Sequence, residues 1–493
     1  MYRSQKFLKN NSISQISNST EKIKNGSAFF AILGANVDGN NFIPEAIKKG
    51  ARIIISSKKS SLREVKNNKI IKIYSKNIRS FYSEECSRIF EHPSKKISIC
   101  GITGTNGKSS VAALLSHIWG LESTGVIGTI NIQYGNKKEK SKLTTPDCYE
   151  INKILKKMKE KRIRNLFMET SSHALEQERV HGIQFESAIF TNLTQDHFDF
   201  HKNMNNYFKA KKKLFSQYLN KSKKKNKFAI INIDDRYGLK IVEEKKKSIK
   251  YYTYSMKNPS ADFYIQKVNK VKKKYELNIV YMKKTCKVLT PMFGNFNFEN
   301  ILAAFAYSII KKKPLKVIID KIASFKGAKG RLEAVGKKQK VIFIDYAHTH
   351  DALEKTLKSI KIEYPNKKII TVFGCGGDRD IKKRAKMGEV GVKYSDKVYL
   401  TNDNPRTEDP KKIINDIVGG TKKSKKIKII LNREEAIKKA IVTADIKDVI
   451  LIAGKGHENY QEINGVREAY SDHKVVSEIL KRWNFIRNIY QNF

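Results

Sequence analysis

A short apolar strand, a glycine-rich loop and a helix follow one another in the stretch CGITGTNGKSSVAALL, which begins at Cys100. Glycines let successive backbone N–H groups point at phosphate oxygens, a lysine adds a positive charge, and a serine hydroxyl can ligate Mg²⁺. The pattern G-x-x-x-x-G-K-[ST] is not matched, because Ile102 stands where its first glycine would be. The strand before the loop and the helix after it still predict a phosphate-binding loop at residues 104–110.

Three α/β units are predicted along the 493 residues, at 1–95, 96–328 and 329–493. Strands that alternate with helices indicate mostly parallel sheets in the second and third units. In the third unit, polar or glycine-rich stretches follow four predicted strands, and ligands collect at the carboxyl ends of such strands. In the second unit, NMNNYFKAKKKLFSQYL is expected to be a long helix, and NFNFENILAAFAYSII an Asn-rich loop that enters an apolar helix.

The formal net charge of +50 has two readings. A basic patch that binds nucleic acid is one, and it would make the chain a nucleic-acid-binding NTPase. The favoured reading is compositional, because the lysines are dispersed and no segment interleaves aromatic residues with arginine in a base-stacking pattern. No run of residues is apolar and long enough to suggest a signal peptide or a membrane span. The five cysteines include no C-x-x-C pair, so we expect reduced thiols in a cytoplasmic protein.

A carboxylate and an imidazole follow two further strands, Glu169 at the end of NLFME and His197 in TQDHFDFH. Such side chains hold a cation or serve as helix caps. Read with GTNGKSS, TTPD, SSHALEQERV, YFKAK, GNFNFEN, GRLE and DYAHTHDAL, they occur in the order found in the Mur ligases. The chain resembles that family along nearly its full length, and GCGGDRD, DNPRTEDP and AGKGHE narrow the resemblance to its tripeptide-forming branch.

The resemblance implies an N-terminal α/β domain for a UDP-muramoyl substrate, a central ATPase domain of the P-loop type and a C-terminal Rossmann-like α/β domain. It implies an ATP-dependent amide ligase of peptidoglycan synthesis, which forms an acyl phosphate that an amine then displaces. The implied partners are small-molecule substrates alone, with no specific nucleic acid and no membrane insertion. We expect a monomer.

The implied cofactors are ATP, two Mg²⁺ ions and a CO₂-derived carbamate on Lys211, with Lys209 as the alternative position for the modified lysine. A lysine must be neutral to react with CO₂, and the like charges of neighbouring lysines are expected to lower its pKa. The implied metal ligands are Ser109, Glu169, His197 and carbamylated Lys211. The implied catalytic residues are Lys108, Glu169, His197 and Lys211.

Two further sets of residues are carried over from the resemblance. Those expected to bind ATP are Gly104, Thr105, Asn106, Gly107, Lys108, Ser109, Ser110, Asn297, Asn300, Arg331 and Asp345. Those expected to bind the UDP-muramoyl dipeptide are Thr20, Thr144, Thr145, Ser171, Gln177 and Arg179. Thr20 carries the weakest match, because the family's D-S-R reads Ser19-Thr20-Glu21 here.

The DNPR stretch resembles that of ligases that add meso-2,6-diaminopimelate to UDP-N-acetylmuramoyl-L-alanyl-D-glutamate. The far end of this amino acid carries an amine and a carboxylate, and an arginine can grip the carboxylate bidentately. A ligase that adds lysine to the same acceptor, or glutamate to folate, is the alternative within the family. The residues expected to bind diaminopimelate are Arg379, Asp403, Asn404, Pro405, Arg406, Gly454 and Glu458.

Overall fold

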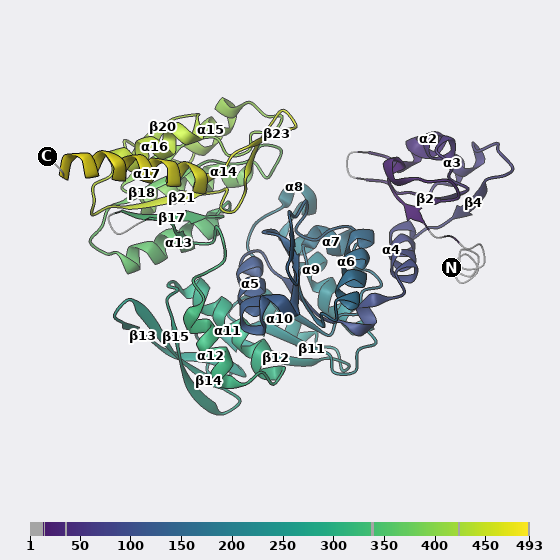
Figure 1. Ribbon diagram of the computed structural model, residues 1–493, viewed down its shortest axis with the longest axis horizontal. Coiled ribbons are helices and arrows are strands. Elements are labelled where there is room, and N and C mark those ends of the chain that lie inside the picture. Colours follow the sequence, from purple (N-terminus) through teal and green to yellow (C-terminus); the bar gives the residue numbers. More distant parts are fainter. Residues whose placement is uncertain (1–12, 14, 35–36, 337–339, 423, 492–493) are drawn as a thin grey trace.

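The computed structural model describes residues 13, 15–34, 37–336, 340–422 and 424–491. These form three lobes that follow one another along the chain, and each lobe is built on its own sheet (Figure 1). The predicted fold class, α/β with mostly parallel sheets in three domains, is confirmed. Within the described part of the chain, no helix is long and apolar enough to span a membrane.

The N-terminal sheet contains four parallel strands in sequence order, β1 (Ile16–Ser17), β2 (Ala28–Ala31), β3 (Ile53–Ser56) and β4 (Ile71–Tyr74). Helices α2 (Ile43–Lys48) and α3 (Lys59–Arg63) connect the strands, and their apolar residues share one core with one face of the sheet. Helix α4 (Ile78–Ile89) packs on the other face. The same core includes Cys148 of the central domain, so α4 also contacts that domain.

The central sheet has eleven strands, and its middle is parallel: β12 (Lys250–Ser255), β11 (Phe228–Asn232), β10 (Ser187–Phe190), β5 (Ser98–Thr103), β9 (Asn165–Glu169) and β6 (Thr124–Ile127) lie side by side. Alternate residues of β5 enter opposite cores, because successive side chains of a strand point to opposite faces. Ile99 packs with α6 (Cys148–Glu160) and α9 (Met204–Lys213), whereas Cys100 and Ile102 pack with α5 (Lys108–Trp119) and α11 (Asn295–Ile310). This burial fixes the carboxyl end of β5 at the centre of the domain.

Both edges of the central sheet are antiparallel, which the sequence analysis did not anticipate. One edge is formed by β13 (Phe263–Val271), β14 (Lys274–Tyr281) and β15 (Lys284–Thr290), and the other by β7 (Ile132–Tyr134) and β8 (Lys137–Glu139). The predicted Asn-rich loop before the apolar helix is wrong, because α11 already begins at Asn295. The predicted long helix is confirmed as α9, continued by a π-helix over Leu214–Leu219.

The C-terminal sheet has the order β16 (Glu333–Ala334), β17 (Val341–Asp345), β21 (Val449–Ala453), β18 (Ile369–Phe373), β19 (Lys397–Leu400) and β20 (Ile427–Ile429), and only β16 is antiparallel. Helices α13 (His350–Glu363), α14 (Lys382–Tyr394) and α15 (Pro410–Val418) contribute to one core, and α16 (Arg433–Thr443) and α17 (Asp472–Gln491) to the other. A two-stranded hairpin, β22 (Tyr460–Ile463) and β23 (Val466–Ala469), follows β21. The carboxyl ends of β17, β21, β18 and β19 therefore meet along one edge.

All five cysteines are free thiols, as expected. The sulfur atoms of Cys86 on α4 and Cys148 on α6 lie 3.4 Å apart, although 62 residues separate them in the sequence. This contact lies at the packing of α4 against α6, where the N-terminal lobe adjoins the central one.

Candidate functional site

A cavity of about 780 Å³ opens between the central and C-terminal domains. The C-terminal domain lines it with residues that follow the carboxyl ends of β17, β18, β19 and β21, as the sequence analysis predicted for a ligand site. The central domain lines it with residues 129–130, 140–144, 196–197 and 199. Residues from two domains therefore form one candidate site.

The glycine-rich loop lies between the end of β5 at Thr103 and the start of α5 at Lys108. Gly107 has a φ of +90°, and a Cβ there would lie 2.4 Å from Oδ1 of Asn300, so the loop packs tightly against α11. The Lys108 side chain is half-buried, and its ammonium donates to the carbonyl oxygens of Gly104 (3.0 Å) and Thr105 (2.8 Å). Burial lowers the pKa of Lys108. The loop, the helix N-terminus and this lysine together form an anion-binding arrangement.

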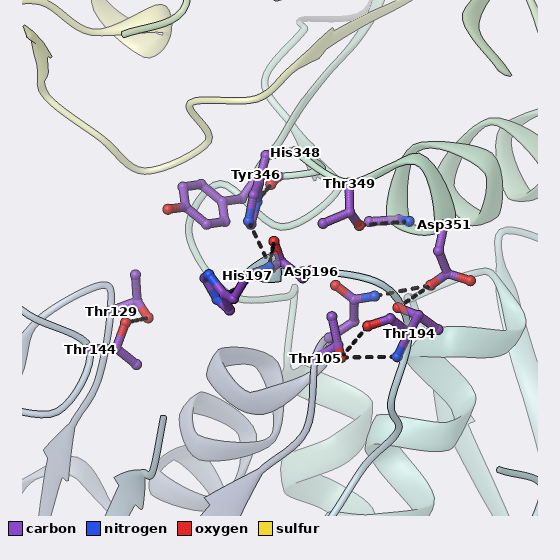
Figure 2. Close-up of polar contacts among 12 residues, drawn as sticks. Thr105, Thr129, Thr144, Thr194, Asp196, His197, Tyr346, His348, Thr349 and Asp351 are labelled. Carbon is purple, nitrogen blue, oxygen red and sulfur yellow. Dashed lines mark hydrogen bonds and ion pairs between the residues drawn. The ribbon is translucent and has the colours of Figure 1, made fainter. Parts of the chain in front are cut away.

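The C-terminal domain contacts this loop directly. Nη2 of Arg331 donates to Oγ of Ser109 at 3.0 Å. The Asp351 carboxylate, near the start of α13, accepts from Nδ2 of Asn106 at 3.0 Å and from Oγ1 of Thr194 at 3.3 Å (Figure 2). The expected sharing of the phosphate site between two domains therefore has a geometric basis in these contacts.

The other residues expected to bind ATP have protein partners. Nδ2 of Asn297 donates to the carbonyl oxygen of Phe293 at 2.9 Å. The Asp345 carboxylate accepts from the backbone N–H groups of Leu332 (2.5 Å) and Ala347 (2.9 Å), and burial raises the pKa of this carboxyl group. Asp345 thus fixes the backbone beside Arg331.

Glu169, at the end of β9, is only 2% exposed. Its carboxylate accepts from the backbone N–H of Thr129 at 2.8 Å and from the Thr129 hydroxyl at 3.1 Å. The Thr129 hydroxyl also lies 3.1 Å from that of Thr144 (Figure 2). Glu169 is therefore a buried carboxylate next to two hydroxyls that line the cavity.

Asp196 lies between two histidines, one from each domain (Figure 2). Its Oδ2 is 3.3 Å from Nε2 of His197 and 3.7 Å from Nε2 of His348. Burial acts to raise the pKa of Asp196, but its interactions with His197, His348 and Lys383 outweigh burial and hold this pKa well below its usual value. Burial also lowers the pKa of His197 well below its usual value.

Lys211 on α9 is 2% exposed, whereas its neighbour Lys209 is exposed. Nζ of Lys211 donates to the carbonyl oxygen of Gly104 at 2.7 Å and lies 4.5 Å from the ring centroid of Tyr207. The pKa of Lys211 is well below its usual value, as expected, but the neighbouring lysines on its helix are not the cause. Burial is the main cause, and the charge of Lys108 adds to it.

Among the described residues, no hydrogen bond joins Glu169, His197 and Lys211 to one another, although the charge of Lys211 acts on the His197 imidazole. Within the described residues, no group of three or more His, Cys, Asp or Glu side chains could hold a metal ion. The expected ligand set contains only two residues of these types.

Most of the residues expected to bind the UDP-muramoyl dipeptide form one hydrogen-bonded group. Oγ1 of Thr145 donates to the carbonyl oxygen of Glu169 (2.7 Å) and lies 3.3 Å from Oγ of Ser171, which caps α7 (Ser172–Glu176). Nη1 of Arg179 donates to the Thr145 carbonyl oxygen at 2.9 Å, and Nε to Gln177 at 3.0 Å. Thr20 does not join this group, because it lies in a short 3₁₀ helix of the N-terminal domain.

Asp403, Asn404 and Arg406 of the DNPR stretch line the C-terminal wall of the cavity together with Glu458, whereas Pro405 is not among the lining residues. Arg406 has a left-handed φ of +53°, unusual for a residue other than glycine. Its guanidinium donates to the carbonyl oxygen of Gly377 at 2.6 Å and lies 3.9 Å from the Glu462 carboxylate. Arg379 is exposed and also lines the cavity. The same wall thus presents guanidinium and carboxylate groups.

Sequence reasoning missed Lys455 and the hairpin of β22 and β23. The hairpin lines the cavity with five residues, Tyr460, Glu462, Arg467, Glu468 and Ala469. Its backbone also holds Arg406, whose N–H donates to the Glu462 carbonyl oxygen at 3.0 Å. The signal was present in the sequence, because Asn464-Gly465 between alternating residues is typical of a tight hairpin turn.

Comparisons with known proteins match all three lobes. Residues 12–89 match the Mur ligase family catalytic domain, 102–308 the Mur ligase middle domain and 330–456 the Mur ligase glutamate ligase domain. UDP-N-acetylmuramoyl-L-alanyl-D-glutamate–2,6-diaminopimelate ligase of Aquifex aeolicus is 40% identical, over 94% of this chain and 92% of its own. The enzyme of the same name from Clostridium perfringens is 40% identical, over 96% of this chain and 97% of its own.

Solved structures agree with these matches. A structure of a UDP-N-acetylmuramoyl-L-alanyl-D-glutamate–2,6-diaminopimelate ligase superposes with a TM-score of 0.67, at 31% identity, over 96% of this chain and 95% of its own. MurF of Thermotoga maritima in complex with ADP has the same fold, with a TM-score of 0.61 at 19% identity, over 95% of this chain and 97% of its own. From the ordered motifs, the three sheets and these matches together, the chain belongs to the Mur ligase family.

Proposed function

We propose that this chain is an ATP-dependent ligase that joins meso-2,6-diaminopimelate to UDP-N-acetylmuramoyl-L-alanyl-D-glutamate. The observation that carries the proposal is the C-terminal wall of the 780 Å³ cavity, where Arg406 and Arg379 lie with Asp403 and Glu458. The far end of diaminopimelate carries one positive and one negative group, and this wall offers partners for both. The far end of lysine lacks the carboxylate, so lysine offers the guanidinium of Arg406 no anionic group to bind.

The reaction has two steps. A carboxylate oxygen of the acceptor attacks the γ-phosphorus of ATP, the bond from that phosphorus to the bridging oxygen breaks, and ADP leaves with the electron pair. The amine nitrogen then attacks the acyl carbon of the acyl phosphate, the carbon–oxygen bond to phosphate breaks, and the amine loses a proton. Two anions meet in the first step, so positive groups must surround them.

The chain's own cations meet this need. Lys108 and Arg331 lie at the glycine-rich loop from two domains, so both would contact the phosphates when the domains close on ATP. The remaining ATP contacts are proposed as carried over from the family, including Asn297, Asn300 and Asp345. Closure of the two domains would also exclude water from the acyl phosphate.

Two Mg²⁺ ions are part of the proposal. The Glu169 carboxylate and the Ser109 hydroxyl are oxygen ligands of the kind that Mg²⁺ prefers, and both lie beside the nucleotide loop. The neutral imidazole of His197 would be a further ligand. When bound, the ions would neutralise phosphate charge.

A carbamate on Lys211 would supply the remaining anionic ligand. Carbamylation requires a neutral amine, and the burial that lowers the pKa of Lys211 supports this modification at Lys211 rather than at the exposed Lys209. The amine loses a proton, its nitrogen bonds to the carbon of CO₂, and the cation becomes an anion.

The UDP-muramoyl dipeptide is proposed to lie along Thr144 and the group of Thr145, Ser171, Gln177 and Arg179. The division into domains at residues 95/96 and 328/329 is part of the same proposal. One chain supplies every residue named here, so we also propose that it acts as a monomer.

A competition assay tests the function. The enzyme is incubated with ATP, Mg²⁺, the UDP-muramoyl dipeptide and equal concentrations of meso-diaminopimelate and L-lysine, and the product is identified by mass spectrometry. We expect the diaminopimelate adduct alone. A lysine adduct would leave the ligase activity in place but overturn the selectivity, and no adduct would overturn the function.

A further inference from the structure

Lys455 lies behind two residues that line the proposed diaminopimelate site, Asn404 and Glu458. We infer that it is a positioning residue, whose buried ammonium fixes the side chains of Asn404 and Glu458 in the orientation that receives the distal ammonium of the amino acid. This inference rests on the proposed function and adds a residue to it.

The burial of Lys455 is complete. It follows β21, between Gly454 and Gly456, which both have positive φ, and it is 0% exposed. Lysine is almost never fully buried unless it is paired, because removing its charge from water costs several kcal/mol. A chain that keeps a lysine in this place must compensate for that cost with specific contacts.

The contacts of Lys455 all lie at the amino-acid site. Nζ donates to Oδ1 of Asn404 at 2.9 Å and to Oε2 of Glu458 at 3.2 Å. It also lies 5.5 Å from the ring centroid of Tyr460 and 5.9 Å from that of Tyr470. Asn404 and Glu458 line the cavity, but Lys455 is not among the lining residues. Lys455 therefore acts on a ligand through neighbours that line the cavity, and Asn404 and Glu458 are the two that it contacts by hydrogen bonds.

These contacts determine how the Asn404 amide is oriented. Its Oδ1 accepts from Lys455 and from the backbone N–H of Glu462 (3.0 Å), while its Nδ2 donates to Oε2 of Glu458 (3.0 Å). A rotation of the amide by half a turn would place the NH₂ group against an ammonium and an N–H donor. Lys455 thus excludes the reversed amide.

Glu458 is held by the same network. Its Oε2 accepts from both Lys455 and Asn404, and its Oε1 has a longer contact of 3.4 Å with the Tyr346 hydroxyl. Two strong donors on one oxygen fix the carboxylate plane, and the other oxygen keeps capacity for a further donor. The distal ammonium of diaminopimelate is a donor of the required kind.

If Lys455 only stabilised the domain through an ion pair, a different effect of its replacement would be expected. It would affect the stability of the domain and the use of every amino acid equally. A positioning role affects the recognition of one group on the ligand, the distal ammonium. The comparison of diaminopimelate with 2-aminopimelate, which keeps the distal carboxylate but lacks the distal amine, separates the two roles.

The experiment measures kcat and KM of the full-length enzyme with each amino acid, for the wild type and for Lys455→Met. In the wild type we expect kcat/KM to favour diaminopimelate over 2-aminopimelate. In Lys455→Met we expect KM for diaminopimelate to rise at least about tenfold, as for the loss of a charged hydrogen bond. The preference over 2-aminopimelate should fall by a similar factor, while KM for ATP stays within about twofold.

Lys426→Met is the matched control. Nζ of Lys426 also makes two hydrogen bonds, to the carbonyl oxygens of Val392 (3.0 Å) and Ser395 (2.9 Å), in the same domain but among residues that do not line the cavity. It should leave the preference unchanged. Lys455→Gln, which keeps an N–H donor, is the second variant if Lys455→Met does not fold, and we expect a smaller loss of preference.

The outcomes are distinct. If folded Lys455 variants keep the wild-type preference for diaminopimelate, or lose activity with both amino acids equally, the positioning role is overturned. If the wild type itself forms no product with diaminopimelate, the proposed function fails instead.

Discussion

Lys211 and Lys108 approach the same glycine-rich loop from different helices, since the ammonium groups of both donate to the carbonyl oxygen of Gly104. Two cations beside one carbonyl oxygen raise the cost of charging either, so burial and mutual repulsion together lower the pKa of Lys211. At the residue scale, burial and this repulsion distinguish Lys211 from the exposed Lys209 of the same helix.

The first prediction concerns Lys211→Ala. We expect ligase activity to fall by at least about 100-fold, because an anionic metal ligand is lost. Acetate should restore part of the activity by supplying a free carboxylate. Steady-state rates with and without acetate check this, and Lys209→Ala is the matched control because Lys209 is exposed on the same helix. Full activity of Lys211→Ala without acetate would remove Lys211 from the mechanism.

The second prediction concerns Arg406→Ala. Loss of a bidentate partner for the distal carboxylate should raise KM for diaminopimelate by about 10- to 100-fold. KM for ATP should stay within about twofold, because Arg406 contacts Gly377 and the hairpin rather than the nucleotide loop. Steady-state kinetics with each substrate varied in turn check this. Unchanged KM values for both substrates would contradict the selectivity argument.

The third prediction concerns the pH dependence of stability through Glu299 on α11. Burial, with the charges of Asp234 and Asp351, raises the pKa of Glu299 to about 7 from 4.5, although Lys355 opposes the shift. The folded state therefore holds the proton more tightly than the unfolded state. The free energy of unfolding falls as the pH rises through the window from 4.5 to about 7. Above that window, the ionised Glu299 destabilises the folded state by the full amount, which is the penalty of burying its charge.

Replacing Glu299 by Gln removes this penalty. We expect Glu299→Gln to stabilise the protein by about 1–3 kcal/mol at pH 8 and by much less at pH 4.5. Denaturant unfolding at the two pH values measures the difference. Glu243→Gln, an exposed position on α10 (Arg236–Glu243), is the control and should change stability little at either pH. An equal effect of Glu299→Gln at both pH values would contradict the argument.

At the scale of elements, the fourth prediction concerns the packing of the glycine-rich loop against α11. In Gly107→Ala, the alanine backbone would have to adopt a φ of +90°, and its Cβ would lie 2.4 Å from Oδ1 of Asn300. We expect a loss of about 1–3 kcal/mol in the free energy of unfolding and at least about a tenfold loss of activity. Unfolding curves and ATP-dependent rates check both. Gly419→Ala is the control, because the nearest atom to a Cβ there is 3.5 Å away.

The parallel strands and the glycine-rich loop could be predicted from the sequence, because continuous apolar runs followed by glycine or polar residues have few other structural solutions. The antiparallel edge of β13, β14 and β15 could not. Its turns place Lys272, Met282 and Lys283 at positive φ, where the usual signal would be Asn or Gly. Helix α11 was misjudged at its start, because its asparagines, typical of loops, are held there by tertiary contacts such as the packing of Asn300 against Gly107.

In the candidate site too, some features could be predicted from the sequence and others could not. The residues at strand ends could be predicted, because parallel strands bring their carboxyl ends to one edge. The contacts between domains could not, since nothing in the spacing of Asn106 and Asp351 indicates that their side chains meet. Lys455 was missed because a lysine between two glycines is typical of an exposed loop, whereas here the partners from the DNPR stretch bury it.

At the scale of the whole molecule, the site depends on two domains that meet through polar contacts at the glycine-rich loop and through Phe293, which packs against Phe343 and Tyr364. At the phosphate loop, Arg331 contacts Ser109 and Asp351 contacts Asn106. At the cavity, His348 faces Asp196. The C-terminal domain therefore contacts both the phosphate loop and the central-domain side of the cavity. Domains of one chain are expected to move relative to each other unless their interface is large and hydrophobic. Binding of ATP and the amino acid to opposite domains would favour the closed arrangement.

The measurement that tests the account most directly is phosphate release from ATP in the presence of the UDP-muramoyl dipeptide. It compares meso-diaminopimelate, L-lysine, no amino acid, and RNA in place of the amino acid. The account predicts release that depends on diaminopimelate and does not respond to RNA. Release that RNA stimulates and no amino acid affects would contradict it, and would assign the +50 net charge to nucleic-acid binding.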